Sequence, residues 1–196
     1  MARKRSLGRQ NPPQIHMYTE GQTEVLYFNQ LKKHFRVKSG KKLTVKQINK
    51  QGLKLFHHVK TLYRKHDFKV SPTDIILVVD KDQTSISELE QLKESCNQKG
   101  YQLMFSNHSF EPWILLHFEK VSTYMENPDL IKKLNKLVGG KYQKTDNRFV
   151  EKLVSTVQKA IEHSKEMSPE IQDFKQNPYT NVGKIIPTLF TLDETS

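Results

Sequence analysis

The chain has 196 residues, of which 35% are hydrophobic, a composition that predicts one ordinary core rather than two large ones. No apolar run approaches the ~20 residues that span a bilayer, and no signal-peptide core follows the basic amino terminus, so we expect a soluble, cytoplasmic protein. The single cysteine, Cys96, excludes an intramolecular disulfide and a cysteine zinc cluster.

The net charge of +11 is unevenly distributed along the chain. Residues 1–70 hold 17 Lys or Arg against three acids, a net charge of +14, whereas the remainder is net −3. Concentrated positive charge favours a nucleic-acid backbone, with a solvated basic surface as the alternative. An anionic membrane is disfavoured because the basic residues surround a helix end and a loop. The residues predicted to bind nucleic acid here are Lys32, Lys33, Arg36, Lys38, Lys41 and Lys42.

The chain begins with a basic, polar segment, residues 1–13, which we expect to be a flexible arm. A strand-like stretch over 14–18 then leads through an acidic turn into a helical pattern with its apolar residues on one side, at Val25, Phe28, Leu31 and Phe35. Gly21 permits the turn and Thr23 caps the helix, which leaves Glu20 at the carboxyl end of the strand. Glu24, in the first helical turn, favours the helix dipole or reaches a metal.

A second, more exposed strand is predicted over 42–48, followed by an amphipathic helix over 53–66. The apolar run 75–79 then predicts a strand buried on both faces, and Asp80-Lys81-Asp82 follows it directly. Ligands of such sheets gather at the carboxyl ends of the strands, and carboxylates there suit a hard cation. The alternative is that the two acids only open the turn into the next helix, predicted over 85–99 and ended by Gly100.

A further strand is predicted over 101–107, and Glu111 follows it among apolar residues that belong to the core. His117 lies within these residues and is interpreted as a satisfied core histidine. The last third shows helical patterns over 128–138 and 147–163 and no evident strand, and Thr180 or Asn181 caps a final helix. The alternation of strands and helices predicts an α/β fold with a mostly parallel sheet flanked by helices. We therefore expect the arm 1–13, a core over 14–126, and a mainly helical part of the same domain over 127–196.

Four segments taken together resemble the RloB-like family over about the whole chain from Ile15 to Phe190. They are Thr19-Glu20-Gly21-Gln22-Thr23-Glu24, Val78-Val79-Asp80-Lys81-Asp82, the stretch from Ser106 to Phe118 that contains Ser109-Phe110-Glu111-Pro112-Trp113, and Asn177-Pro178-Tyr179-Thr180-Asn181-Val182. Such proteins resemble the Toprim fold, in which a glutamate and an Asp-x-Asp bind magnesium and act on phosphodiesters. The resemblance implies Glu20, Asp80 and Asp82 as these acids, while Glu24 and Glu111 match further acidic positions. It also implies a bacterial defence context and allows for a separate ATPase subunit.

One departure from the family pattern is His108, which stands where a proline is expected before Ser-Phe-Glu. It offers a titratable group near the proposed centre, or it is a turn residue without chemistry. Lys81 and Lys184 are further candidates for phosphate contact or proton transfer. If the carboxyl-terminal segment returns near the centre, as the resemblance suggests, then Asn177 and Thr180 contact phosphate as well.

The function that these observations favour is a phosphodiesterase acting on DNA or RNA that uses one or two Mg²⁺ or Mn²⁺ ions. Glu20, Asp80 and Asp82 are the first-line ligands, Glu111 is an additional one, and Glu24 is the next. The alternatives are a non-catalytic nucleic-acid-binding regulatory subunit and an enzyme that processes small nucleotides. The sequence leaves the oligomeric state open, a homo-oligomer included.

Overall fold

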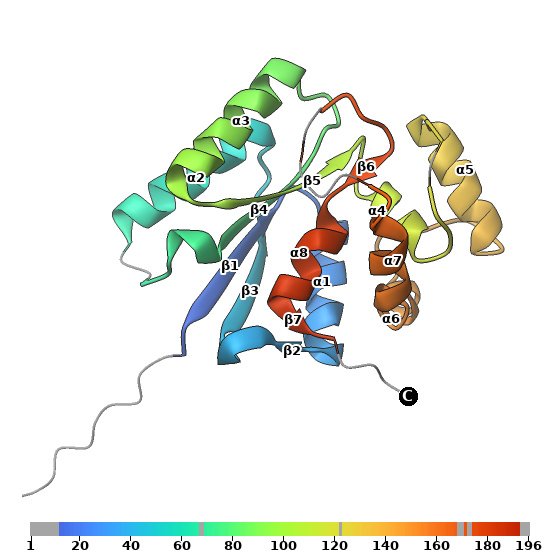
Figure 1. Cartoon of the computed structure of the whole chain (residues 1–196), viewed down its shortest axis with the longest axis horizontal. Helices are drawn as coiled ribbons and strands as arrows, with labels where there is room; N and C mark the ends of the chain where they lie inside the picture. The colour runs from blue at the N-terminus through green and yellow to red at the C-terminus, as the bar shows by residue number, and fades with distance from the viewer. Residues whose placement is uncertain (1–11, 67–68, 122, 168–170, 172–173, 193–196) are drawn as a thin grey trace, which may run out of the picture.

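The computed structural model describes residues 12–66, 69–121, 123–167, 171 and 174–192 (Figure 1). The predicted basic arm lies almost wholly outside the described residues. In chain order the strands and α-helices are β1 (Gln14–Thr19), α1 (Gln22–His34), β2 (Arg36–Val37), β3 (Lys42–Gln47), α2 (Gly52–Lys65), β4 (Ile75–Asp80), α3 (Ile86–Lys99), β5 (Gln102–Asn107), α4 (Glu111–Leu116), α5 (Asn127–Leu137), α6 (Asn147–Val154), α7 (Val157–Ser164), β6 (Tyr179–Thr180), α8 (Val182–Leu189) and β7 (Phe190–Thr191).

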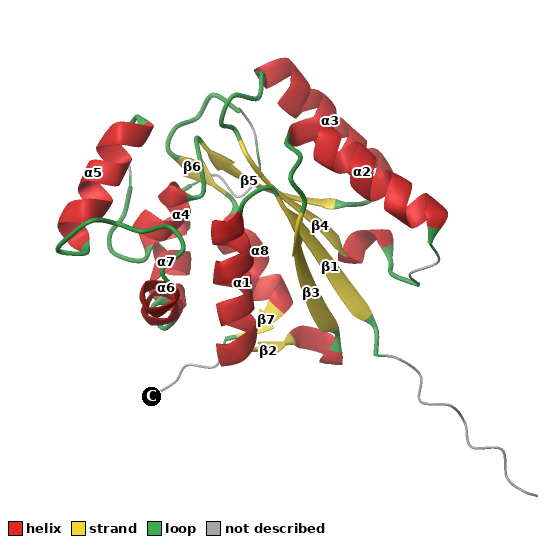
Figure 2. Ribbon diagram, turned by 180° about the vertical axis from the view of Figure 1, so that it is seen from behind, coloured by secondary structure: helices red, strands yellow, loops and turns green. Residues whose placement is uncertain are grey.

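The central sheet has the strand order β3-β1-β4-β5-β6 (Figure 2). The first four strands are parallel to one another, and β6 joins the edge of β5 in the antiparallel sense. The predicted α/β fold with a mostly parallel sheet and a helical carboxyl-terminal addition is therefore confirmed. Within the described residues, no helix is long and apolar enough to span a bilayer.

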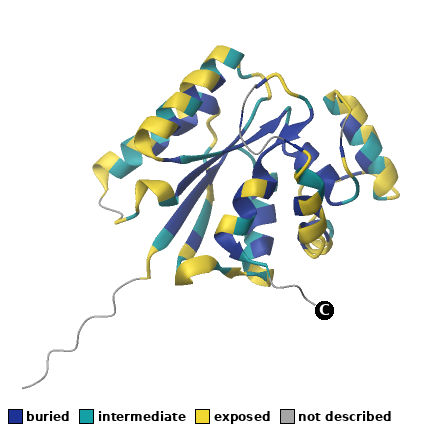
Figure 3. Cartoon of the chain, viewed as in Figure 1, coloured by how far each residue is buried: buried dark blue, intermediate teal, exposed yellow. Residues whose placement is uncertain are grey.

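The middle strands of the sheet, β1 and β4, are buried on both faces, which explains why β4 is an uninterrupted apolar run (Figure 3). Side chains alternate across a strand, so Ile76 and Val78 pack with α1 and α8, whereas Ile75, Leu77 and Val79 pack with α2 and α3. The helices α4, α5, α6 and α7 extend the first of these two clusters beyond the edge of the sheet (Figure 1). The carboxyl ends of the four parallel strands therefore lie at the same edge of the sheet, between two layers of helices.

The prediction of no strand in the last third is wrong, because β6 and β7 lie there. Each has two residues, and each exists through a distant partner: β6 pairs with the end of β5, and β7 pairs with β2. Such short strands carry no periodicity of their own. The pairing of Thr180 with Ser106 does bring the carboxyl-terminal segment back to the carboxyl edge of the sheet, as expected.

The helix predicted over 147–163 is two helices, α6 and α7, with a break at Ser155 and Thr156. Both hydroxyls donate hydrogen bonds to backbone carbonyls three residues earlier. Ser155 Oγ donates to the carbonyl of Lys152 over 2.6 Å, and Thr156 Oγ1 donates to that of Leu153 over 2.8 Å. Side chains of this kind compete with the helical backbone for hydrogen bonds. The break between α6 and α7 follows from that competition. The spacing of apolar residues in the sequence does not reveal it.

Candidate metal and phosphate site

The acids predicted from the sequence lie at the carboxyl edge of the sheet, on three adjacent strands. β1 and β4 are neighbours, so Glu20 and Asp80 leave the sheet side by side. Glu111 opens α4, just beyond the end of β5, which pairs with β4 on its other side. Three acids far apart in sequence therefore meet because parallel strands end at the same edge.

Glu20 is fixed by the elements on either side of it. The N–H of Gly52, at the start of α2, donates to Glu20 Oε1 over 2.6 Å, and the N–H of Asp80 donates to Oε2 over 3.4 Å. Burial, aided by the negative charges of Glu24 and Asp82, raises the pKa of Glu20 to about 7 against the lowering effect of these hydrogen bonds. Without a cation, this carboxyl group is therefore partly protonated near neutral pH.

Glu24 and Asp80 each keep one inaccessible carboxylate oxygen, Oε2 and Oδ1 respectively, that has no hydrogen-bond partner among the described residues. Burial raises the pKa of Asp80 well above its usual range, and the charges of Glu24, Glu20 and Glu111 add to the effect. Burial likewise raises the pKa of Glu24, to which Glu111 contributes by repulsion. A buried carboxylate oxygen without a donor is costly, so these two oxygens are suited to a ligand that carries positive charge.

Gly21 is required here by space rather than by an unusual backbone angle, because its φ is an ordinary −112°. A Cβ at this position would lie 2.5 Å from Glu24 Oε2, since the Glu24 side chain folds back over the turn. The prediction that Thr23 caps α1 is wrong: the N-cap residue is Gly21, and no side chain caps it. The glycine instead lets Glu24 reach the other acids.

Asp82 is the exposed member of the set and lies in a loop after β4, with a positive φ of 36°. Its N–H donates to the carbonyl of His108 over 2.8 Å, and Gln51 Nε2 donates to its Oδ2 over 3.1 Å. The N–H of Lys81 donates to the carbonyl of Ser106 over 3.0 Å in the same way. The loop after β4 is thus tied to the end of β5, and Asp82 faces the loop that precedes α2.

A cavity of about 590 Å³ opens over these acids. Glu111 is not part of its wall. The residues that line it are Glu20, Gly21, Glu24, Asn49, Lys50, Gln51, Lys54, Asp80, Asp82, Gln83, Thr84 and Glu88. Sequence reasoning missed Lys50, Lys54 and Glu88, which reach the cavity from the loop before α2, from the first turn of α2 and from α3, respectively. Glu88 Oε1 accepts the N–H of Leu53 at 3.3 Å, so it helps to hold the start of α2 beside Glu20.

Lys144 is a further residue that sequence reasoning missed. Its Nζ lies 2.5 Å from Oε1 of Glu111, whose side chain is 2% exposed while that of Lys144 is 54% exposed. The lysine belongs to the segment between α5 and α6, so the helical addition supplies a cation to the buried acids. The pair joins residues 33 positions apart in the sequence, and nothing in the local pattern marks it.

The six basic residues predicted to bind nucleic acid lie at the other edge of the sheet. They occupy the last turn of α1, the segment after it, and the start of β3, where Lys42 pairs with Gln14 at the beginning of β1. Lys41 forms an ion pair of 2.7 Å with Asp74, just before β4. Because β1 has six residues, roughly 17 Å of strand separate this basic edge from the acids. The structure therefore does not bring the predicted basic residues and the predicted acids together.

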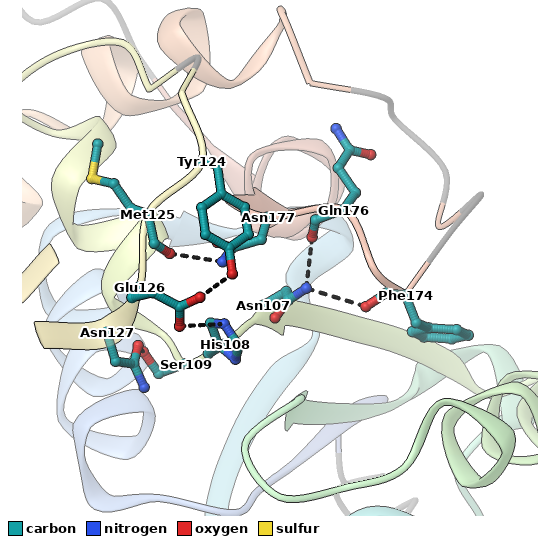
Figure 4. Close-up of polar contacts among 10 residues, drawn as sticks. All are labelled: Asn107, His108, Ser109, Tyr124, Met125, Glu126, Asn127, Phe174, Gln176 and Asn177. Atoms are coloured by element: carbon teal, nitrogen blue, oxygen red, sulfur yellow. Dashed lines mark hydrogen bonds and ion pairs between the residues drawn. The ribbon is translucent and has the colours of Figure 1, made fainter. Parts of the chain in front are cut away.

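The remaining candidates for contact with phosphate each have other partners or positions, and Figure 4 shows the contacts of His108 and Asn177. His108 Nε2 lies 3.5 Å from Glu126 Oε2, and the side-chain amide of Asn177 donates to the carbonyl of Met125 over 2.7 Å. Thr180 is buried, and its hydroxyl meets that of Ser106 at 2.9 Å. Lys184 lines two other hollows, away from the acids. A contact between any of these residues and phosphate stays a prediction.

His117 has the structural role that the sequence suggested. It is buried, and its ring nitrogens lie 2.9 Å from the Tyr27 hydroxyl and 3.0 Å from Thr156 Oγ1. Because the Thr156 hydroxyl already donates to the Leu153 carbonyl, His117 Nδ1 carries the proton and Nε2 accepts from Tyr27. Burial lowers the pKa of His117 to about 3, so the ring is neutral.

The acids supply the carboxylate oxygens that a divalent metal site needs, but their side chains are not arranged as a complete coordination shell. Within the part of the chain that the structure describes, no group of three or more His, Cys, Asp or Glu side chains is arranged to hold a metal ion. Glu111 is engaged by Lys144, and both oxygens of Glu20 accept backbone hydrogen bonds. The unpartnered oxygens of Asp80 and Glu24, together with the mutual repulsion of four acids, nevertheless fit a hard cation with oxygen ligands.

The fold and this edge define a class: an α/β protein whose buried carboxylates converge where neighbouring parallel strands end. The family model for RloB-like proteins matches residues 15–189, and the chain belongs to the RloB-like family. Comparisons with curated proteins and with solved structures gave no match.

The raised pKa of Glu20 predicts a pH-dependent effect of Glu20→Gln on stability. Between pH 4.5 and about 7 the folded protein holds a proton on Glu20 that the unfolded chain has lost, so the wild type loses stability as pH rises through this window. Glutamine does not titrate, so the variant should gain about 3 kcal/mol relative to wild type between pH 4.5 and pH 8. Urea unfolding in EDTA at several pH values measures this difference.

Comparing the two proteins at each pH cancels the contribution of groups that do not interact with Glu20, such as His117, whose lowered pKa acts in the opposite direction. Glu90→Gln, which removes an exposed carboxyl group on α3, is the matched control. A stability difference between Glu20→Gln and wild type that stayed constant over this range would show that Glu20 has an ordinary pKa.

Proposed function

We propose that this protein is a metal-dependent phosphodiesterase that cleaves DNA or RNA, with its reaction centre at the carboxyl edge of the sheet. The observation that carries the proposal is the cluster of acids Glu20, Glu24, Asp80 and Glu111, of which Glu24 and Glu111 are buried and Glu20 and Asp80 half-buried. Burial and the neighbouring charges raise the pKa of Asp80 and Glu24, and among the described residues one oxygen of each of these two has no hydrogen-bond donor. A fold seldom retains such a cluster for stability alone, and perturbed carboxyl groups in a cavity are typical of functional sites. The resemblance to the Toprim fold also supports a metal-dependent phosphodiesterase.

Asp80, Glu20 and Glu24 would hold one or two Mg²⁺ or Mn²⁺ ions, with Asp82 reaching in from its loop and Glu111 joining when Lys144 moves aside. The metal would supply positive charge to the scissile phosphate and activate water for the attack. Lys50 and Lys54, which line the same cavity, are placed to bind the phosphates on either side. The start of α2 adds the positive end of a helix dipole next to Glu20.

We further propose that the reaction serves bacterial defence against foreign genetic elements, beside a separate ATPase subunit, a context supported by membership of the RloB-like family. A second candidate function is a regulatory subunit that binds nucleic acid and does not cleave it. The engagement of Glu111 by Lys144, with no finished metal geometry among the described residues, favours this alternative.

Cleavage assays on labelled single-stranded and duplex DNA and RNA, in Mg²⁺, Mn²⁺ or EDTA, separate the two functions. We expect products with a divalent metal, none in EDTA, and none from a folded Asp80→Asn variant. Binding of nucleic acid without products in any metal would contradict catalysis by this chain alone and favour the regulatory subunit.

A further inference from the structure

A second cavity, of about 620 Å³, lies in the helical addition and combines aromatic and cationic walls. Phe118 and Phe149 form one side, with ring planes 10° apart and ring centroids separated by 6.4 Å. Leu153 and Val138 continue the apolar surface. Cavities of this size accept a small organic ligand or one unit of a polymer.

Three exposed cations, Arg148, Lys152 and Lys159, also line this cavity. Among the described residues none of the three forms an ion pair, so their charge is available to a ligand. The one acid in the wall, Asp146, already accepts the N–H groups of Arg148 and Phe149 as the N-cap of α6. The cavity therefore favours a ligand that is both aromatic and anionic.

The sequence around the cavity is basic, although the net charge of residues 71–196 as a whole is negative. Residues 132–159 hold eight Lys or Arg against two acids, a net charge of +6. The cavity is also connected to the acids: Lys144, which contacts Glu111, is two residues before Asp146 in the segment that leads into α6. A nucleic-acid strand that passes over the acids and then along this segment would reach the aromatic wall of the cavity.

We propose that this cavity binds one nucleotide of a single-stranded nucleic acid, with the base against Phe118 and Phe149 and the phosphate against Arg148, Lys152 and Lys159. Aromatic side chains beside a positively charged groove are the common means of holding unpaired nucleotides. The inference rests on the proposed function in that it takes nucleic acid as the substrate, and it adds that the substrate has an unpaired base flanking the cleaved bond. A duplex, whose bases are stacked and paired, would bind less tightly.

Fluorescence anisotropy with a labelled single-stranded oligonucleotide, on the full chain in EDTA so that nothing is cleaved, tests the assignment. Phe149→Leu keeps an apolar side chain against Tyr142 but removes the aromatic face, and should weaken binding about tenfold. Lys152→Gln should weaken binding and lower the slope of log K against log salt by about 1. Lys99→Gln, the same change of charge at the end of α3, is the matched control and should match wild type.

Thermal melts show whether Phe149→Leu is folded, and Lys152→Gln, at an exposed position, keeps the test valid if it is not. Equal binding by Lys152→Gln and Lys99→Gln would overturn the assignment. Competition by AMP or UMP as effective as competition by the unlabelled strand would also overturn it, in favour of a site for free nucleotides. Cleavage by the wild type tests the reaction centre separately: products with unchanged binding in the variants would remove only this subsite, and weakened binding without any products would remove only the nuclease.

Discussion

Asp80→Asn should stabilise the metal-free protein at pH 8 and abolish metal-dependent cleavage. In the wild type the Asp80 carboxylate is buried, keeps an unpartnered Oδ1 and is repelled by Glu24, Glu20 and Glu111. Asparagine has the same shape without the charge, so we expect a gain of about 1–3 kcal/mol in the free energy of unfolding in EDTA. The cleavage rate should fall on the order of 10³-fold, because a residue proposed to hold the metal no longer offers a carboxylate.

The stabilising effect should fade toward acidic pH, since the raised pKa of Asp80 means that the wild type takes up a proton there and removes the repulsion itself. Asp74→Asn is the control: it makes the same change at the other end of β4, where the carboxylate pairs with Lys41. It should lower stability and leave metal-dependent cleavage intact. A loss of stability in Asp80→Asn at pH 8 would show that Asp80 is structural, and would remove the main support for a reaction centre here.

The fold could be predicted as far as its elements depend on local patterns. The buried run of β4, the helical spacing of α2 and α3, and the glycine that ends α3 at a φ of 71° are all legible in the sequence. The two-residue strands β6 and β7 are not, because each is defined by hydrogen bonds to a partner far away in the chain. The division between α6 and α7 was missed for another reason: hydroxyl groups compete with the helix where the apolar spacing continues.

For the site, the convergence of Glu20 and Asp80 followed from one rule, that parallel strands end at the same edge. The basic residues were harder to place, because charge counts along the sequence do not say at which edge a residue lies. The cluster from Lys32 to Lys42 lies away from the acids, whereas Lys50 and Lys144 reach them from loops and Lys54 from the first turn of α2. Their contribution depends on long-range packing, which requires the assembled fold.

Lys144→Met should lower the stability of the metal-free protein and increase its stabilisation by Mn²⁺. Methionine is similar in length but uncharged, so Glu111 would remain buried without its cation, and Asp80 and Glu24 would lose the attraction of Lys144 that now lowers their pKa. Leaving a buried carboxylate without its partner should cost about 1–3 kcal/mol, a moderate figure because Lys144 is itself half-exposed. Urea unfolding at pH 8 with EDTA and with Mn²⁺ measures both effects.

The Mn²⁺ effect is expected because the Lys144 ammonium and a divalent metal would compete for the same carboxylate. In the wild type a metal must share Glu111 with Lys144 or displace it, whereas in Lys144→Met the metal replaces the missing charge. Lys141→Met, an exposed position in the same segment, should leave both quantities at the wild-type values. If Mn²⁺ stabilised Lys144→Met and wild type equally, Glu111 would not be a ligand, and its ion pair with Lys144 would serve only to anchor the helical addition to the sheet.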